Sequence, residues 1–324
     1  MLFAFVSTHA IAQNSQESQD SLQQESFYEK FPRTRFLNIE YGQSLDRGFR
    51  SELFGENFQE GDIKSQQNFS ATTNIPLYEK QNWSLLASGA YQVNSYEFQN
   101  IGNLSSINVF EQNGVVDFHN FSVGLSSTYF STLFNTPIIY MGSITADGND
   151  DGFQRIKGLV GFSFILKQTE QTTITLGAIG FLDPSSQIPF SPTFSYNHSF
   201  KNSNWELDFI LPERLLLRRS VGENSRVSFG SSLGYSGFYV DVNDQIIGDV
   251  FAYSQIEIKT GIMYEHRIND YLIGTFQGGV QNFIGNQSTE KGEPAQDFIY
   301  KNKQDAAKYF QIGISIDPFA KRKK

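Results

Sequence analysis

The fold of this chain is decided by residues Lys308–Phe319, whose sequence is KYFQIGISIDPF. Phe310, Ile312, Ile314 and Ile316 alternate there with Tyr309, Gln311, Gly313, Ser315 and Asp317. Strict alternation with a period of two predicts a β-strand with one apolar face and one face of small or polar residues. Such a strand near the end of a chain is what a closed transmembrane β-barrel needs as its last strand.

The composition fits a membrane barrel. The 324 residues include 31 Phe, 15 Tyr and 27 Gly, and only 18% are charged. A barrel exposes only alternate residues to lipid, so it needs no long apolar runs. The net charge of −9 argues against a nucleic-acid partner, which usually requires a basic face. The absence of cysteine excludes disulfides and thiolate chemistry.

Alternating segments recur along the chain, and none shows a convincing helical period. In Asn82–Tyr96, for example, Trp83, Leu85, Ala87, Tyr91 and Val93 fall on the apolar face. Ser84, Ser88, Gln92 and Asn94 fall on the other face. The segments expected to be strands are Arg33–Leu45, residues 69–77, Asn82–Tyr96, Phe118–Leu133, Pro137–Ala146, Ile156–Lys167, Thr172–Leu182, Phe190–Phe200, Trp205–Leu211, residues 213–220, Arg226–Val240, Val250–Arg267, Tyr271–Ile284 and Lys308–Phe319.

Connections between these segments alternate in length. Short ones include Glu79–Gln81 and Gly222–Ser225, whereas Asp46–Ile63, Glu97–Asp117 and Gly285–Gln304 are long. Outer-membrane barrels have short periplasmic turns and longer extracellular loops. The lengths therefore predict a single closed antiparallel all-β barrel, and they do not suit a sandwich of two sheets.

The strand count depends on Trp205–Ser220, which contains Pro212. Proline cannot donate a ladder hydrogen bond, so it predicts a break that divides this stretch into two strands. The total is then about 14, an even number that keeps both ends of the chain on the periplasmic side. If this stretch folds inward instead, the count is about 12.

The ends of the chain have their own signals. Residues 1–12 are mostly apolar and end in Ala10-Ile11-Ala12, which predicts a signal peptide cleaved after Ala12. Residues 13–32 are rich in Gln, Ser and Glu and are expected to form a disordered periplasmic leader. The barrel then covers residues 33–319, and residues 320–324 form a short basic tail.

Three features together resemble a Bacteroidota-type outer-membrane β-barrel family of unknown function. They are the polar leader, the stretch WELDFILPERLLLRR at Trp205–Arg219, and the closing IDPF at Ile316–Phe319. The resemblance covers residues 28–319 and implies no particular activity. It departs from the usual pattern at the end, because residues 320–324 follow the last aromatic residue, Phe319.

Charged residues gather on the polar face of neighbouring strands. A charge on the lipid face near mid-membrane costs about 2–4 kcal/mol, so these side chains are expected in the lumen. They form either a structural salt-bridge network or a constriction that selects solutes. The candidates are Glu40, Glu206, Asp208, Arg218, Arg226, Glu257, Lys259, Glu265 and Arg267.

Other motifs are weaker. Asp147, Asn149 and Asp151 match the first half of a calcium loop, but Gly158 stands where the closing acid is needed, so a plain turn is favoured over a weak calcium site. His119 near several serines leaves a barrel phospholipase as a minor alternative. No cofactor motif is present, and no enzyme is predicted.

The sequence thus predicts an outer-membrane protein of a Gram-negative bacterium, exported through a cleaved signal peptide. The expected function is a passive, porin-like channel for small polar solutes, or a structural barrel with a charged lumen. A secreted soluble β-sandwich is the alternative. Expected partners are outer-membrane lipid and the barrel-assembly machinery, with no nucleic acid.

Overall fold

The structure is a computed structural model that describes residues 31–32, 34–104, 114–244 and 248–318. The predicted signal peptide, the basic tail and nearly all of the leader lie outside these residues. In the described part every regular element is a strand of one 16-stranded sheet. None of the described residues forms a helix that is long and apolar enough to cross a membrane.

The strands are β1 (Leu37–Ser44), β2 (Arg47–Leu53), β3 (Glu56–Lys80), β4 (Trp83–Asn103), β5 (Gly114–Leu133), β6 (Thr136–Asn149), β7 (Gly152–Gln168), β8 (Thr172–Leu182), β9 (Phe190–Ser199), β10 (Trp205–Leu211), β11 (Arg214–Val221), β12 (Ser225–Asp244), β13 (Gly248–Arg267), β14 (Leu272–Glu290), β15 (Phe298–Gln304) and β16 (Ala307–Ile316).

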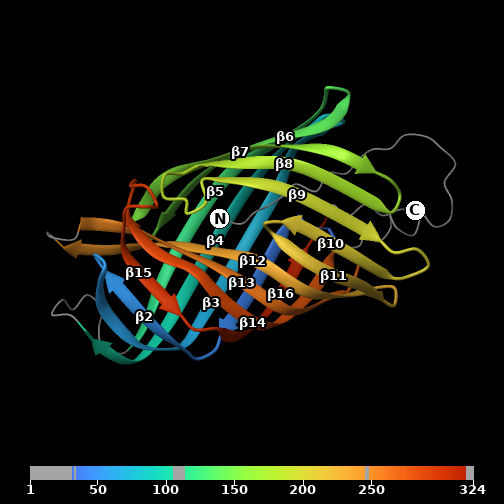
Figure 1. Cartoon of the computed structure of the whole chain (residues 1–324). Helices are drawn as coiled ribbons and strands as arrows, with labels where there is room; N and C mark the ends of the chain where they lie inside the picture. Colours follow the sequence, from blue (N-terminus) through green and yellow to red (C-terminus); the bar gives the residue numbers. More distant parts are fainter. Residues whose placement is uncertain (1–30, 33, 105–113, 245–247, 319–324) are drawn as a thin grey trace.

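The sheet closes on itself (Figure 1). β1 pairs with β16 and β3, while β2 pairs with β15 and β3. β1 and β2 therefore occupy one place in the wall, and β15 and β16 occupy the next, where both pair with β14. The result is an antiparallel ring of 14 strands, which confirms the predicted barrel and strand count. The alternative of a two-sheet sandwich is wrong, because the ring is a single closed sheet.

The two ends of the barrel differ as predicted. At one end, which we call the turn end, strands are joined by short connections such as Gln81–Asn82 and Phe134–Asn135. Phe134 and Asn135 have φ angles of 53° and 59°, as a two-residue hairpin of type I′ requires. β1 begins and β16 ends at the turn end, where Leu37 pairs with Ile316. The opposite end is called the loop end.

The predicted long loops were partly wrong. Most of Asp46–Ile63 is strand, formed by β2 and the first part of β3 around a tight turn at Phe54–Gly55. Most of Gly285–Gln304 is also strand, formed by the last part of β14 and by β15. β4 continues to Asn103, so the predicted loop Glu97–Asp117 begins later than expected. The barrel is therefore taller at the loop end than the sequence indicated.

The wall has very unequal height. Pro212 separates β10 from β11 as predicted, and these strands have only 7 and 8 residues. β3 and β4 have 25 and 21 residues. A tilted strand needs about 9–11 residues to cross a bilayer. β10 and β11 are thus a low section of wall, whereas β3 and β4 extend well beyond a bilayer's thickness.

We call the part of the wall from the turn end up to Val93 of β4, with its neighbours Phe69 and His119, the turn half. Its outer face is apolar, as predicted. Val123, Phe229 and Ile314 are 64%, 57% and 51% exposed, and similar side chains surround the barrel. A soluble protein rarely exposes an apolar belt of this extent.

The remaining loop half has the opposite polarity. Its outer face carries exposed cross-strand ion pairs, Arg50–Glu60, Lys64–Glu97 and Lys303–Glu52. Its inner face carries aromatic side chains, and Phe58 and Tyr96 are only 1% and 4% exposed. Apolar residues point inward and charges outward, as in a protein surrounded by water.

In the loop half β12 leaves its neighbour and packs across the barrel. β11 pairs with β12 only as far as Ser232. Further along, the Phe238 ring stacks on Phe118 of β5 with centroids 4.1 Å apart. On the other side of β12, the Tyr239 hydroxyl donates to Asp147 of β6 at 2.9 Å. In Figure 1 this part of β12 lies below β6 to β9. The side-chain contacts of Phe238 and Tyr239 therefore join β12 to β5 and β6 on the loop-end side of the short strands β10 and β11.

Candidate functional site: the lumen of the barrel

The first group of charged side chains lies in the lumen near the turn end and is centred on Asp208 and Glu265. Asp208 accepts from Arg214 at 2.8 Å and lies 2.6 Å from Arg218. Glu265 lies 2.6 Å from Arg226 and 2.5 Å from Arg35. We call these side chains the turn-end network. Glu206 is buried beside it, as the cross-strand neighbour of Arg218.

A second group lies further along β13. Glu257 pairs with Lys259 at 3.1 Å, accepts from Gln255 at 2.8 Å, and also accepts from Gln281. Ser44 of β1 donates to Gln281 at 2.5 Å. We call this the Glu257 network. Glu40, half-buried on β1, acts electrostatically on Lys259.

The nine predicted lumen residues are therefore distributed over separate groups. Glu206, Asp208, Arg218, Arg226 and Glu265 come together, and Glu257, Lys259 and Glu40 form the second group. Arg267 does not join either, because it contacts Asp270 and backbone oxygens in the turn after β13. Sequence reasoning missed Arg35, which precedes β1, and Arg214, which follows Pro212. Arg214 has the same parity as Arg218 along this stretch, which was the available signal for it.

These lumen charges are buried. Asp208 is 0% exposed, and Glu265, Glu257 and Arg226 are 3%, 5% and 6% exposed. Phe31, itself 1% exposed, lies over the Arg226 guanidinium at 4.8 Å. Side chains that line a water-filled pore stay accessible to water, whereas these do not. These charged side chains are therefore packed against their partners and are not free to contact a solute.

A third polar group joins β6, β7 and β12 in the loop half. The Lys157 ammonium and the Tyr239 hydroxyl both donate to Asp147. Arg155 pairs with Asp183 at 3.0 Å. Two of the three calcium candidates, Asp147 and Asn149, thus have side-chain partners, since Asn149 donates to Asp241 at 2.7 Å. No three potential metal ligands of the His, Cys, Asp or Glu type converge among the described residues.

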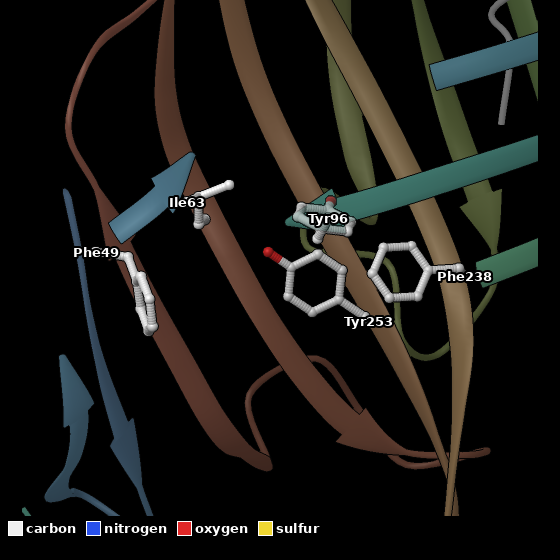
Figure 2. Close-up of a cluster of buried hydrophobic side chains, with 5 residues drawn as sticks. All are labelled: Phe49, Ile63, Tyr96, Phe238 and Tyr253. Carbon is white, nitrogen blue, oxygen red and sulfur yellow. The ribbon is translucent and has the colours of Figure 1, made fainter. Parts of the chain in front are cut away.

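An apolar cavity of about 100 Å³ occupies the loop half. Its walls come from β2, β3, β4, β5, β12, β13, β14 and β15. Figure 2 shows the rings of Tyr96, Phe238 and Tyr253 lying together, with Phe49 and Ile63 on the opposite side. Small-molecule sites are lined mainly by apolar and aromatic side chains, with a few polar groups among them. The cavity is of this kind.

The cavity has a polar floor on the side of the turn end. The buried guanidinium of Arg47 donates to Gln304 at 2.7 Å and to Gln66 at 2.5 Å. Gln66 in turn donates to the Tyr96 hydroxyl at 3.0 Å. Burial raises the pKa of Tyr96 and raises the pKa of Tyr300 to about 12, so both hydroxyls stay protonated at neutral pH. Sequence reasoning missed the whole cavity.

The three histidines among the described residues each contact a hydroxyl group. His119 contacts Tyr91 at 2.9 Å, His198 contacts Thr172 at 2.8 Å, and His266 contacts Ser225 at 2.9 Å. The predicted candidate, His119, thus meets a tyrosine and not a serine. The expectation that the chain is no enzyme stays a prediction.

No family model matches the chain, and no curated protein matches it. An outer-membrane channel from Pseudomonas putida F1 is 9% identical, with 87% of this chain and 96% of that chain covered and a TM-score of 0.36. The translocator domain of the autotransporter NalP from Neisseria meningitidis is 11% identical, with 92% and 97% covered and a TM-score of 0.33. Outer membrane phospholipase A from Escherichia coli is 10% identical, with 86% and 97% covered and a TM-score of 0.30.

Similarity at this level carries no argument about function. The resemblance to a Bacteroidota-type barrel family stays a prediction from sequence.

Proposed function

We propose that this chain is an outer-membrane β-barrel that binds a small apolar molecule in the cavity of its loop half. The observation that carries the proposal is the cavity itself: aromatic side chains line the inside of a barrel section whose outside is charged. An apolar molecule gains about 25 cal/mol for each Å² of apolar surface that it buries there.

Placement in the outer membrane is supported by the apolar belt of the turn half. The belt surrounds a closed ring without an unpaired edge, which is the condition for a sheet in lipid. Outer-membrane lipid is then the partner of the belt. The short connections at the turn end correspond to periplasmic turns, so the cavity opens toward the outside of the cell.

The buried networks favour a binding barrel over an open pore. A passive channel for polar solutes, selected by lumen charges, requires these networks to separate. Conductance of the Arg226→Ala and Glu257→Ala variants in planar bilayers tests this second hypothesis. Currents indistinguishable from the wild type would count against a charged constriction.

A pair of neighbouring substitutions on β5 tests the cavity. Val116 lines the cavity, whereas Val115 is 65% exposed on the opposite face. We expect Val116→Trp to fill the cavity and to weaken binding of the neutral fluorescent probe N-phenyl-1-naphthylamine about tenfold or more, as the loss of about 1.4 kcal/mol implies. Val115→Trp is the matched control and should leave binding unchanged.

The measurement is fluorescence titration of the barrel in lipid nanodiscs, with empty nanodiscs subtracted. Equal probe affinity of the wild type and Val116→Trp would refute the cavity as the binding site. A monodisperse mature protein that needs no detergent would refute the membrane placement.

A further inference from the structure

A buried cation without an anion lies directly behind Gln304 of the cavity wall. Arg47 is 4% exposed, and its bonded partners are the neutral side chains of Gln304 and Gln66. It also lies over the Phe283 ring at 4.4 Å. No carboxylate among the described residues lies within ion-pair distance of it. Glu257, which acts on it electrostatically, is already bound by Lys259, Gln255 and Gln281.

Two hydrogen-bond donors at the polar floor of the cavity lack a partner. They are Nη1 of Arg47 and Nε2 of Gln304, both buried. The orientation of the Gln304 amide follows from chemistry, because arginine only donates and Gln304 must therefore present its oxygen to Arg47. Its nitrogen is then the free donor. Buried polar groups are nearly always hydrogen-bonded, so these two require an acceptor.

A third donor follows from the same chain of hydrogen bonds. Gln66 accepts from Arg47 through its oxygen, so its nitrogen donates to the Tyr96 hydroxyl. The hydroxyl is thereby an acceptor, and its own hydrogen remains available. Arg47, Gln304 and Tyr96 thus each offer a hydrogen-bond donor that has no partner among the described residues. Gln304 and Tyr96 line the cavity, and Arg47 points to the same side of β2 as Phe49.

We propose, on the basis of the proposed function, that the cavity binds an amphipathic molecule whose apolar part contacts the aromatic walls and whose carboxylate meets Arg47. Arg47 supplies its free Nη1–H to the carboxylate, and Gln304 and Tyr96 supply a second N–H and an O–H, so the bonds to the anion come from neighbouring side chains with one charged donor among them. A neutral ligand can accept a hydrogen bond here, but it leaves the buried charge of Arg47 without a counter-ion. The expected ligand class is a medium-chain monocarboxylate.

The test compares decanoate with methyl decanoate, which has the same chain and no charge. Both displace N-phenyl-1-naphthylamine from the barrel in nanodiscs of zwitterionic lipid. A hydrogen bond to a charged group contributes about 1.5–3 kcal/mol, so the wild type should bind decanoate about 10–100 times more tightly than the ester. This comparison needs no variant and does not depend on how a variant folds.

Arg47→Met should reduce the decanoate-to-ester affinity ratio about 10–100 times, and Arg47→Lys should restore part of it. Arg50→Met is the matched control on the same strand, because Arg50 is exposed on the outer face and pairs with Glu60. It should leave the ratio unchanged.

The outcomes separate this inference from the proposed function. If probe and ester bind but decanoate has no advantage, or if Arg47→Met keeps the ratio, the carboxylate site is refuted and the apolar cavity stands. If neither the probe nor either ligand binds the wild type, both proposals are refuted.

Discussion

Within the single strand β4, residues Trp83–Val93 turn apolar side chains outward, whereas from Asn94 onward the aromatic side chains of Tyr96 and Phe98 turn inward. The strand continues through this change without a break. The same change occurs along β3, where Phe69 is exposed and Phe58 is buried. One continuous sheet thus has an apolar outer face in the turn half and a charged outer face in the loop half, which suits the proposed placement of the turn half in lipid and the loop half in water.

The comparison shows what each half does with charge. The turn half keeps its ion pairs inside, whereas the loop half has ion pairs both inside, such as Lys157–Asp147, and on its outer face. The hydrophobic effect acts in both halves and keeps apolar side chains away from water. The side of the sheet on which the apolar face lies therefore indicates on which side the water is. It also explains why the cavity is in the loop half, where the apolar face is the inner one.

The largest expected effect comes from breaking an ion pair in each half. Glu265→Ala leaves Arg226 and Arg35 without their carboxylate in the buried turn-end network, which should cost about 3–5 kcal/mol of unfolding free energy. Glu60→Ala removes an exposed partner of Arg50 and should cost about 0–1 kcal/mol. Urea unfolding in lipid vesicles measures both, and equal losses would contradict the assignment of buried and exposed pairs.

A charge placed on the outer face sharpens the boundary between the halves. Val123 and Val115 both lie on the outer face of β5, and they are 64% and 65% exposed. Val123→Arg should destabilise the barrel by about 2–4 kcal/mol, because Val123 pairs with Gly89 in the middle of the turn-half section of β4. Val115→Arg, opposite Glu97, should change stability by less than about 0.5 kcal/mol.

The same lipid-vesicle assay applies to this pair. Equal tolerance of arginine at the two positions would show that both halves face the same solvent.

The smallest expected effect is a titration on the outside of the loop half. The hydrogen bond from Lys64 lowers the pKa of the Glu97 carboxyl. A carboxyl with a lowered pKa in the folded state contributes stability above its unfolded pKa, and this is lost as the pH falls through the folded value. Lys64→Met should return the pKa of Glu97 toward its ordinary value, as measured by carboxyl ¹³C NMR. An unchanged titration in the variant would show that the ion pair is not formed in solution.

The turn half could be predicted from the sequence because its alternation is regular. Thr172–Leu182 and Trp205–Leu211 were predicted with the bounds that β8 and β10 have. The strands of the loop half could not be predicted from the sequence. Bulges interrupt the period of two in β3, between Glu60 and Asp62 and between Ile63 and Ser65. Polar outward residues such as Arg50 and Glu52 also gave β2 the composition of a loop.

The site was predictable only in part for the same reason. Alternation placed Asp208, Arg226 and Glu265 in the lumen, but their partners depend on the stagger between strands, which composition does not encode. The cavity needs Phe49 and Phe58 from a stretch assigned to a loop, and Phe238 from a strand that bends across the barrel. Arg47 gave no signal, because its neighbours Asp46 and Arg50 are also charged.

The change of polarity along β3 and β4 also bears on how the proposed outer-membrane barrel is assembled. With both described ends of the sheet at the turn end, the loop half must traverse the bilayer before the turn half can settle in it. Its outer charges, among them Arg50, Lys64 and Lys303, then pass through hydrocarbon once, and each carries a desolvation cost there. In the folded protein these charges are outside the hydrocarbon. Their desolvation is therefore expected to slow insertion and to leave the unfolding free energy unchanged.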